Sequence, residues 1–131
     1  MRRALAGLTS VALGAALLLA LAVSPAAAKR GDVLVRGTCT QASTSKLKLS
    51  AENGRIEVEF EVDQNRNGVR WNVVLTQNGR QIVRLARATT PPSGSFEARV
   101  LAANRAGDDV IRARATSPAG EVCTARATWS A

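Results

Sequence analysis

Apolar and polar residues alternate with a period of two along most of the chain after residue 30. The clearest stretch is residues 55–62, in which four apolar residues alternate with three glutamates. A period of two sends successive side chains to opposite faces of a β-strand, so we expect one face to join a core and the other to form an acidic row in water. Similar stretches recur about every ten residues between Gly, Pro, Asn and Asp, and none has the period of a helix. The expected strands are residues 33–39, 46–50, 55–62, 69–76, 81–88, 95–102, 110–116 and 121–129.

This rhythm predicts an all-β domain. We expect a two-sheet antiparallel sandwich of about seven to eight strands, immunoglobulin-like in size, with a small up-and-down β-barrel as the alternative. Many inward positions of the later strands are alanine, which indicates close packing of the sheets. The residues expected to fill most of the core volume are Phe60, Trp71, Phe96 and Trp129.

The turn residues predict the register of the hairpin between the second and third expected strands. A turn at residues 51–54 would set Lys48 opposite Glu57. The next outward pair is then Lys46 and Glu59. Opposite-charge cross-strand pairs of this kind contribute about 0.2–1 kcal/mol each and help to fix the register.

The Asn78-Gly79 dipeptide predicts a tight hairpin turn whose length is selected by the core pattern. A two-residue turn would set Arg84 opposite Val73 on the buried face. A three-residue loop, residues 77–79, sets apolar residues against one another and is therefore expected. Its predicted pairs are Val73 with Val83, Trp71 with Leu85 and, on the outer face, Val74 with Ile82.

Residues 1–28 have the three parts of a secretory signal peptide. Two arginines precede an apolar stretch of mostly Leu and Ala, residues 4–23, and small side chains end the segment. We expect cleavage after Ala28, which leaves a single secreted β domain, residues 29–131. A retained membrane anchor is the competing interpretation, because the apolar stretch is long enough to cross a bilayer. The mature chain has no other such stretch, so no transmembrane span is expected in it.

The two cysteines, Cys39 and Cys123, lie near the two ends of the expected mature domain. An exported protein meets conditions in which disulfides persist, so we expect these residues to be bonded to each other. In the chain-entropy model, a bond that closes so long a loop stabilises the domain by up to about 4–5 kcal/mol.

The chain contains no His and no Tyr. The lack of His excludes Ser-His-Asp and Cys-His catalysis and ordinary His-based zinc or copper sites. The aromatic residues of the mature domain are too few for the stacking platforms of single-strand nucleic-acid modules, so no specific nucleic-acid partner is expected. No catalytic residue and no cofactor is predicted.

The chain is strongly basic, with 18 Lys and Arg against 10 Asp and Glu and a net charge of +8. Loss of two arginines with the leader would leave a charge of about +6, which raises encounter rates with polyanions such as anionic wall polymers. No dense basic cluster occurs in the sequence, so high solubility alone is the competing explanation of this charge. The candidate binding residues are Arg66, Arg70, Arg80, Arg84 and Arg105.

The connection after the third expected strand matches the opening of a calcium-binding loop. Asp63, Asn65 and Asn67 could direct alternate side-chain oxygens toward a hard cation. The position at which a glutamate should close such a site is Val74, and Arg66 brings positive charge into the loop. An ordinary β-connection needs the same residue types, so we expect a plain turn here, with calcium binding as the alternative.

Paired carboxylates offer the remaining route to acid–base chemistry. Glu57, Glu59 and Glu61 are expected about 6–7 Å apart on one exposed strand face, a separation that suits glycosidase chemistry. Exposure and the neighbouring Lys46 and Lys48 would keep the pKa values of these carboxyls from rising, so no general acid is expected.

Four segments resemble a group of small secreted actinobacterial β-sandwich proteins of unknown function. The segments are GTCT at residues 37–40, SKLKL at 45–49, RIEVEFEVDQNR at 55–66 and EVC at 121–123. The resemblance spans nearly the whole mature domain and implies a shared fold, with no activity to carry over. Strand number and size give a looser likeness to immunoglobulin-type domains. Those domains bridge two inner strands across a central Trp, whereas Cys39 and Cys123 belong to the terminal strands.

Two classes of function remain. The first is a secreted, non-enzymatic binding module that associates with anionic cell-envelope polymers at the cell wall, or with an extracellular protein, through its basic loops. The second is a calcium-dependent glycan binder or small hydrolase that uses the loop after Asp63 and the glutamate face. Binding that is sensitive to salt but not to a chelator favours the first class.

Overall fold

The computed structural model describes residues 31–130 as nine β-strands without a helix. Every strand expected from the alternation is present. The expected leader, residues 1–28, lies outside the described residues, so its cleavage stays a prediction. In the part of the chain that the structure describes, no helix is long and apolar enough to cross a bilayer. The strands are β1 (Val33–Arg36), β2 (Thr38–Cys39), β3 (Thr44–Glu52), β4 (Arg55–Asp63), β5 (Arg70–Gln77), β6 (Arg80–Ala88), β7 (Ser95–Ala103), β8 (Asp109–Thr116) and β9 (Val122–Trp129).

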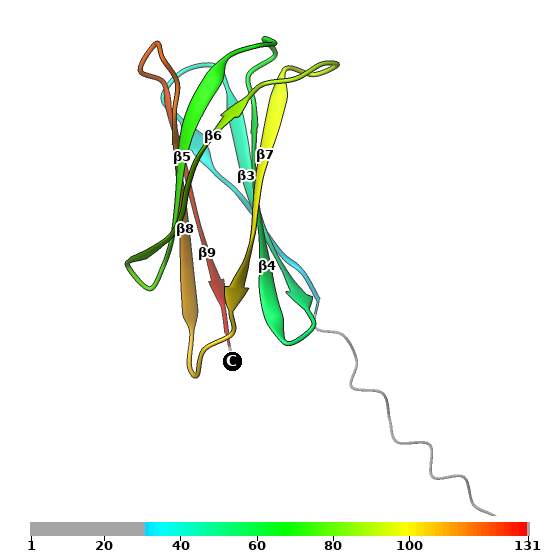
Figure 1. The fold of residues 1–131 in the computed structure, drawn as a ribbon, viewed down its shortest axis with the longest axis vertical. Helices are drawn as coiled ribbons and strands as arrows, with labels where there is room; N and C mark the ends of the chain where they lie inside the picture. Colours follow the sequence, from blue (N-terminus) through cyan, green and yellow to red (C-terminus); the bar gives the residue numbers. More distant parts are fainter. Residues whose placement is uncertain (1–30, 131) are drawn as a thin grey trace, which may run out of the picture.

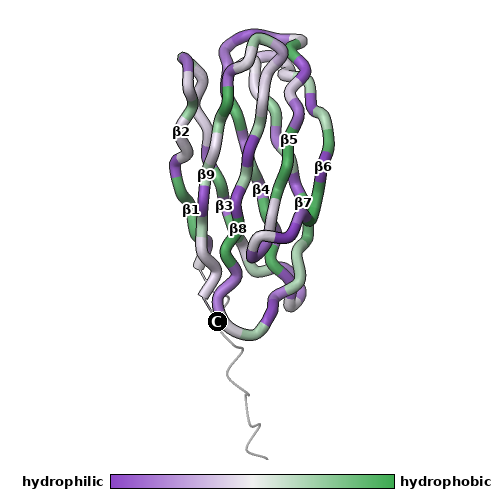
Figure 2. The backbone as a smooth tube through the Cα atoms, turned by 90° about the vertical axis from the view of Figure 1, so that its left-hand side faces the viewer, coloured by the Kyte–Doolittle hydropathy of each residue, from purple (hydrophilic) through white to green (hydrophobic). Residues whose placement is uncertain are grey.

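The strands form two antiparallel sheets that pack face to face (Figure 1). β1, β3, β4 and β7 make a four-stranded sheet in that order, and β2, β9, β8, β5 and β6 make a five-stranded sheet. Figure 2 shows the five-stranded sheet toward the viewer, with its strands in this order across the molecule. The sheets do not close into a barrel, so the predicted sandwich is confirmed and the barrel alternative is wrong.

The first expected strand, residues 33–39, changes sheet in its middle. β1 pairs with β3 in one sheet, and β2 pairs with β9 in the other. Gly37 lies between them, where a Cβ atom would come 2.2 Å from Ser45 Oγ and 2.5 Å from the Thr124 carbonyl oxygen. Glycine is required here because the backbone passes close to both sheets as it crosses from one to the other.

The core lies between the sheets and contains the inward-facing residues that the alternation predicts. Phe60 and Trp71 are fully buried, and the rings of Trp71 and Phe96 are 5.9 Å apart with tilted planes. The inward alanines of β7, β8 and β9 are buried as well, which lets the backbones approach closely around the aromatic side chains. The predicted aromatic core is therefore confirmed.

The β3–β4 hairpin closes through a two-residue turn, because Asn53 (φ 46°) and Gly54 (φ 76°) both adopt the left-handed conformation. The expected turn at residues 51–54 is too long, and the register predicted from it is wrong by two residues. A shift of two keeps each side chain on its predicted face, so the core and the acidic row are unchanged. The observed pairs are Lys48 with Glu59 and Lys46 with Glu61, in place of Lys48 with Glu57 and Lys46 with Glu59.

The β5–β6 hairpin also closes through two residues, Asn78 and Gly79, which both have positive φ. The predicted three-residue loop is wrong, because the irregularity that restores apolar pairing lies within the strands, at Leu75 and Thr76, and not in the turn. The observed pairs are Val73 with Leu85, Leu75 with Val83 and Val74 with Arg84, in place of Val73 with Val83, Trp71 with Leu85 and Val74 with Ile82.

The connection between β3 and β4 distinguishes this sandwich from an immunoglobulin domain. In immunoglobulin domains the second and third long strands lie in different sheets. Here they form a hairpin within the four-stranded sheet, and the chain crosses to the other sheet between β4 and β5. The likeness to immunoglobulin-type domains therefore extends to size and layer number but not to strand order.

Cys39 and Cys123 form a disulfide, as predicted. The bond joins β2 to β9 at one edge of the five-stranded sheet and links residues that are 84 positions apart in the sequence. It stabilises the domain mainly by restricting the unfolded chain, because it ties the first strands to the last. A disulfide fits a protein of an oxidising extracellular environment.

We predict that Gly37→Ala destabilises the domain by about 1–3 kcal/mol, because the new methyl group would overlap Ser45 Oγ and the Thr124 carbonyl oxygen. Gly31→Ala is the matched control, since nothing lies within 4 Å of a Cβ atom at that position. Urea unfolding of both variants and the wild type measures the difference. Equal stability of the two variants would contradict this explanation of Gly37.

Candidate functional site

The two sheets differ in the charges that their strands carry. The five-stranded sheet contains seven arginines, no lysine and one carboxylate, Asp109, which is fully buried. The four-stranded sheet contains six carboxylates and five Lys or Arg. Among residues 31–130, every ion pair uses a cation of the four-stranded sheet. We call the outer face of the five-stranded sheet, with Arg70, Arg84, Arg112, Arg114 and Arg126, the cationic face.

The centre of the cationic face lies on the β8–β9 hairpin. The inward alanines of these strands leave Arg112, Arg114 and Arg126 on the outer side, where all three are exposed. Arg112 lies directly opposite Arg126, and Arg114 lies opposite Thr124. Alternate residues of one strand are about 6–7 Å apart, so the three guanidinium groups extend from neighbouring backbone positions.

An open groove with a volume of about 670 Å³ runs over this part of the face. Four arginines, three threonines and small or apolar residues line it, and its lining contains no carboxylate and no aromatic residue. Guanidinium and hydroxyl donors placed side by side can bind an anionic group through hydrogen bonds as well as through charge. The polar lining residues are Arg36, Thr38, Thr76, Arg112, Arg114, Thr124 and Arg126.

The opposite outer face carries a network of ion pairs centred on Arg99. Its Nη2 lies 2.8 Å from both Glu59 and Glu97, and its Nη1 lies 3.7 Å from Glu57. Lys48 Nζ lies 3.8 Å from Glu59. Ion pairs of a solvent-exposed guanidinium group contribute little to stability, because water and salt screen them. The outward glutamates of β4 therefore form ion pairs with cations of the neighbouring strands and help to hold the sheet in register, as the sequence predicts.

Glu59 departs from the behaviour expected of an exposed carboxyl. Its side chain is only 15% exposed. Burial, a hydrogen bond with Glu57 and the charge of Glu97 raise the pKa of Glu59 above its usual value of 4.5, although Arg99 and Lys48 act to lower it. The expectation that exposure and the lysines keep this pKa from rising is therefore wrong for Glu59, because β3 and β7 cover both sides of β4.

The structure separates the five arginines that the sequence singled out. Arg70 and Arg84 lie on the cationic face, outside the lining of the groove. Arg80 and Arg105 line a small pocket of about 190 Å³ at one end of the sandwich. Arg66 lies in the β4–β5 connection at the other end (Figure 1). The five residues therefore do not form one site.

The sequence interpretation missed the arginines that line the groove: Arg36, Arg112, Arg114 and Arg126. One available signal was the Arg-Ala-Arg pattern at residues 112–114, which places two arginines on one face of a strand. The turn residues that follow predict a hairpin, and a hairpin of suitable register brings Arg126 beside Arg112. No comparable signal places Arg36, because its position depends on the change of sheet at Gly37.

The connection after β4 uses its polar atoms to hold the backbone in place. Asp63 Oδ1 accepts a hydrogen bond from the Asn65 backbone N–H at 3.1 Å. The Arg66 carbonyl oxygen accepts another from Thr89 Oγ1 at 2.5 Å. Such bonds are typical of an ordinary β-connection, which is the expected role of this loop. Calcium binding by Asp63, Asn65 and Asn67 stays the untested alternative.

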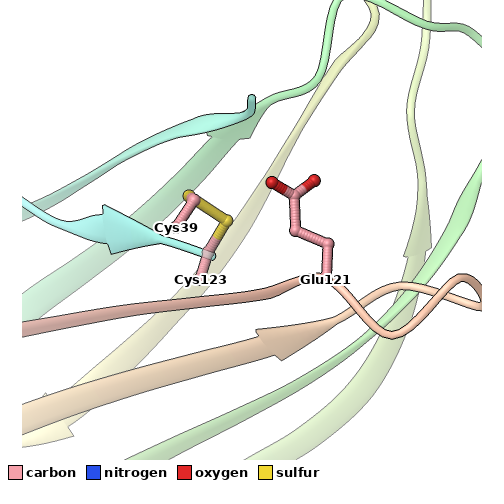
Figure 3. A group of neighbouring side chains, drawn as sticks. All are labelled: Cys39, Glu121 and Cys123. Atoms are coloured by element: carbon pink, nitrogen blue, oxygen red, sulfur yellow. A yellow bond between two sulfur atoms is a disulfide. The ribbon is translucent and has the colours of Figure 1, made fainter. Parts of the chain in front are cut away.

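Cys39, Glu121 and Cys123 are the one group of metal-ligand residue types that residues 31–130 bring together (Figure 3). Both sulfur atoms belong to the disulfide. The Glu121 side chain is 3% exposed and accepts hydrogen bonds from the Gln41 and Ser43 N–H groups, at 3.0 Å each, and from Ser43 Oγ at 2.5 Å. Because all of these ligand atoms are engaged, the cluster fastens the β2–β3 loop to the β8–β9 turn and offers no free donor to a metal.

Comparisons with known proteins do not place the chain in a family. No protein-family model matches it, and no curated protein matches its sequence. A solved structure with partial similarity is the crystal structure of a bromine derivative of BhCBM56, a carbohydrate-binding module. It is 20% identical, the match covers 74% of this chain and 100% of that chain, and the TM-score is 0.43. A similarity of this size does not identify a function, and the resemblance to small secreted actinobacterial proteins stays a prediction.

We predict that Glu121→Gln lowers the free energy of unfolding by about 1–3 kcal/mol, because the two buried donors of Ser43 and the partly buried N–H of Gln41 lose a charged acceptor. Glu52→Gln is the control, since Glu52 accepts one exposed hydrogen bond and should change stability by less than about 0.5 kcal/mol. Urea unfolding measures both values. Equal effects of the two substitutions would count against the role assigned to Glu121.

We predict that Glu59→Gln gains stability relative to the wild type as the pH rises from below 4.5. With a raised pKa, the folded wild type binds more protons at Glu59 than the unfolded chain does, and this proton binding stabilises the wild type. The stabilisation is complete below the unfolded pKa and is lost as pH rises through the folded pKa, whereas the variant has none to lose. Urea unfolding from about pH 3.5 to about pH 7 tests the sign. A relative stability of the variant that falls over this range would show that the pKa of Glu59 is depressed.

Proposed function

We propose that this chain is a secreted, non-enzymatic module that binds anionic polymers of the cell envelope through the cationic face. The observation that carries the proposal is the segregation of charge between the two sheets. Arg112, Arg114 and Arg126 line one groove of the five-stranded sheet. The exposed carboxylates of the strands lie on the other sheet.

This arrangement would favour the binding of a polyanion in two ways. Like charges gathered on one face attract a polyanion over about 10 Å at 0.1 M salt and raise the rate of association. At contact, guanidinium groups form charge-assisted hydrogen bonds with anionic oxygens and displace the counterions of the polymer. The acidic face would point away from the polymer, so the domain would bind in one orientation.

The groups of the groove suit binding without catalysis. Arginine keeps its proton in proteins, so a guanidinium group cannot serve as a general base. A threonine hydroxyl needs a neighbouring base to become a nucleophile, and the groove supplies none. Glu59, the carboxyl with a raised pKa, lies on the opposite sheet in ion pairs with Arg99 and Lys48. We therefore assign the chain a binding role.

The alternative, a calcium-dependent glycan binder, would use the loop after Asp63. Experiments with calcium and with salt distinguish it from binding through the cationic face. Calcium would then raise the melting temperature, and Asp63→Ala would abolish that rise. Binding through the cationic face instead weakens with salt and does not respond to a chelator.

We predict that the mature protein co-sediments with envelope material from its own producer at low salt and is released by about 0.5 M salt, where screening is strong. The triple variant Arg112→Gln, Arg114→Gln and Arg126→Gln should bind at least about tenfold more weakly, because it removes three contacts with anionic groups. Bound and free protein are measured across a series of salt concentrations.

The matched control removes three charges outside the groove, with Arg55→Gln, Arg66→Gln and Arg105→Gln, all at exposed positions. Its net charge equals that of the groove variant, but its groove is intact, so its retention should stay near that of the wild type. The same loss in both triple variants would show that net charge alone causes binding and would contradict a site at the groove. If the wild type is not retained at any salt concentration, the proposed function is wrong.

A further inference from the structure

We propose that the groove recognises phosphodiester groups, so that the polymer bound is a polyol phosphate chain and not a carboxylate polymer; this inference rests on the proposed function. Arg112 and Arg126 would hold one phosphate between them. Arg114 and Thr124, which form the next outward-facing pair of the hairpin two residues further along, would hold the next.

The direct pairing of Arg112 with Arg126 is the first reason to propose that the groove binds an anionic group. Residues directly opposite in an antiparallel pair have Cβ atoms about 4.5–5.5 Å apart, and like charges in this position destabilise a sheet. Within the described residues, no carboxylate forms an ion pair with either arginine. The repulsion is therefore unrelieved in the free domain, and an anion between the two guanidinium groups would relieve it.

The geometry of the donors is the second reason. A guanidinium group is a planar fork that bonds two oxygen atoms at once. A carboxylate has two oxygens in one plane, and a single fork occupies both. A phosphodiester is tetrahedral and presents its oxygens in different planes, so two forks and a threonine hydroxyl can converge on it. The cationic face supplies arginine only, whereas Lys46 and Lys48 lie on the other sheet.

The position of the aromatic residues argues against nucleic acid as the phosphate polymer. Proteins that bind single strands stack the bases on aromatic side chains. Here every aromatic residue is buried between the sheets: Phe60, Trp71, Phe96 and Trp129. A polyol phosphate has no rings to stack, and its carbon chain can lie against Val74 and the threonine methyl groups of the groove.

The first test compares melting temperatures in phosphate and in acetate at equal ionic strength. Phosphate should raise the melting temperature of the mature domain more than acetate does, because it binds the folded state. Phosphate also stabilises folded proteins non-specifically, so Arg126→Gln should reduce the difference and, without phosphate, melt no lower than the wild type, since the repulsion from Arg112 is gone. A difference as large in Arg126→Gln as in the wild type would overturn the inference.

The second test measures affinity for poly(glycerol phosphate) and for polyglutamate of equal charge and length. We expect the wild type to prefer the phosphate polymer by at least about tenfold, through bonds that need the guanidinium fork. The double variant Arg112→Lys and Arg126→Lys keeps the charge and loses the forks. It should lose most of the preference while its affinity for polyglutamate stays unchanged.

The outcomes separate this inference from the proposed function. Equal binding of the two polymers by the wild type, or an unchanged preference in the lysine variant, would overturn phosphodiester recognition and leave polyanion binding in place. Failure of both polymers to bind at low salt would overturn both.

Discussion

Burial of one face of each sheet is the constraint from which the charge distribution of this domain follows. In β4 the apolar residues must face the core, which sends Glu57, Glu59 and Glu61 outward beside the cations of β3 and β7. In β8 the same requirement sends Arg112 and Arg114 outward beside a strand that contains no acid. The alternation that stabilises the fold therefore also produces one face of balanced charge and one face of unbalanced positive charge.

Two buried carboxylates fix the hairpin that carries the groove arginines. Asp109, at the start of β8, accepts hydrogen bonds from Gln77 Nε2 at 2.8 Å and from the Arg105 backbone N–H at 3.0 Å. Glu121, just before β9, fastens the other end of the hairpin to the loop before β3, next to the disulfide. A hairpin held at both ends fixes the backbone positions of its arginines, which would lower the entropy lost if a ligand binds there.

The sequence was sufficient to predict the strands, the two-layer architecture, the core and the disulfide, because each depends on local alternation or on pairing of the only two cysteines. It was insufficient for the hairpin registers, since the β3–β4 turn is the two residues Asn53 and Gly54 and the irregularity of the β5–β6 pair lies within the strands, at Leu75 and Thr76. It also missed the groove. Arg112 and Arg126 meet through the β8–β9 hairpin, whereas Arg36 is far from both in the sequence and joins them only because the chain changes sheet beside β9 at Gly37.

Chemical-shift mapping of the isotope-labelled mature domain during titration with poly(glycerol phosphate) distinguishes the cationic face from the loops at the ends of the sandwich as the binding surface. Binding at the cationic face should place the largest shift changes on backbone amides of β8, β9 and the adjoining part of β5, with little change at residues 63–68. Changes centred on residues 63–68, or on the outer face of β3, β4 and β7, would contradict it.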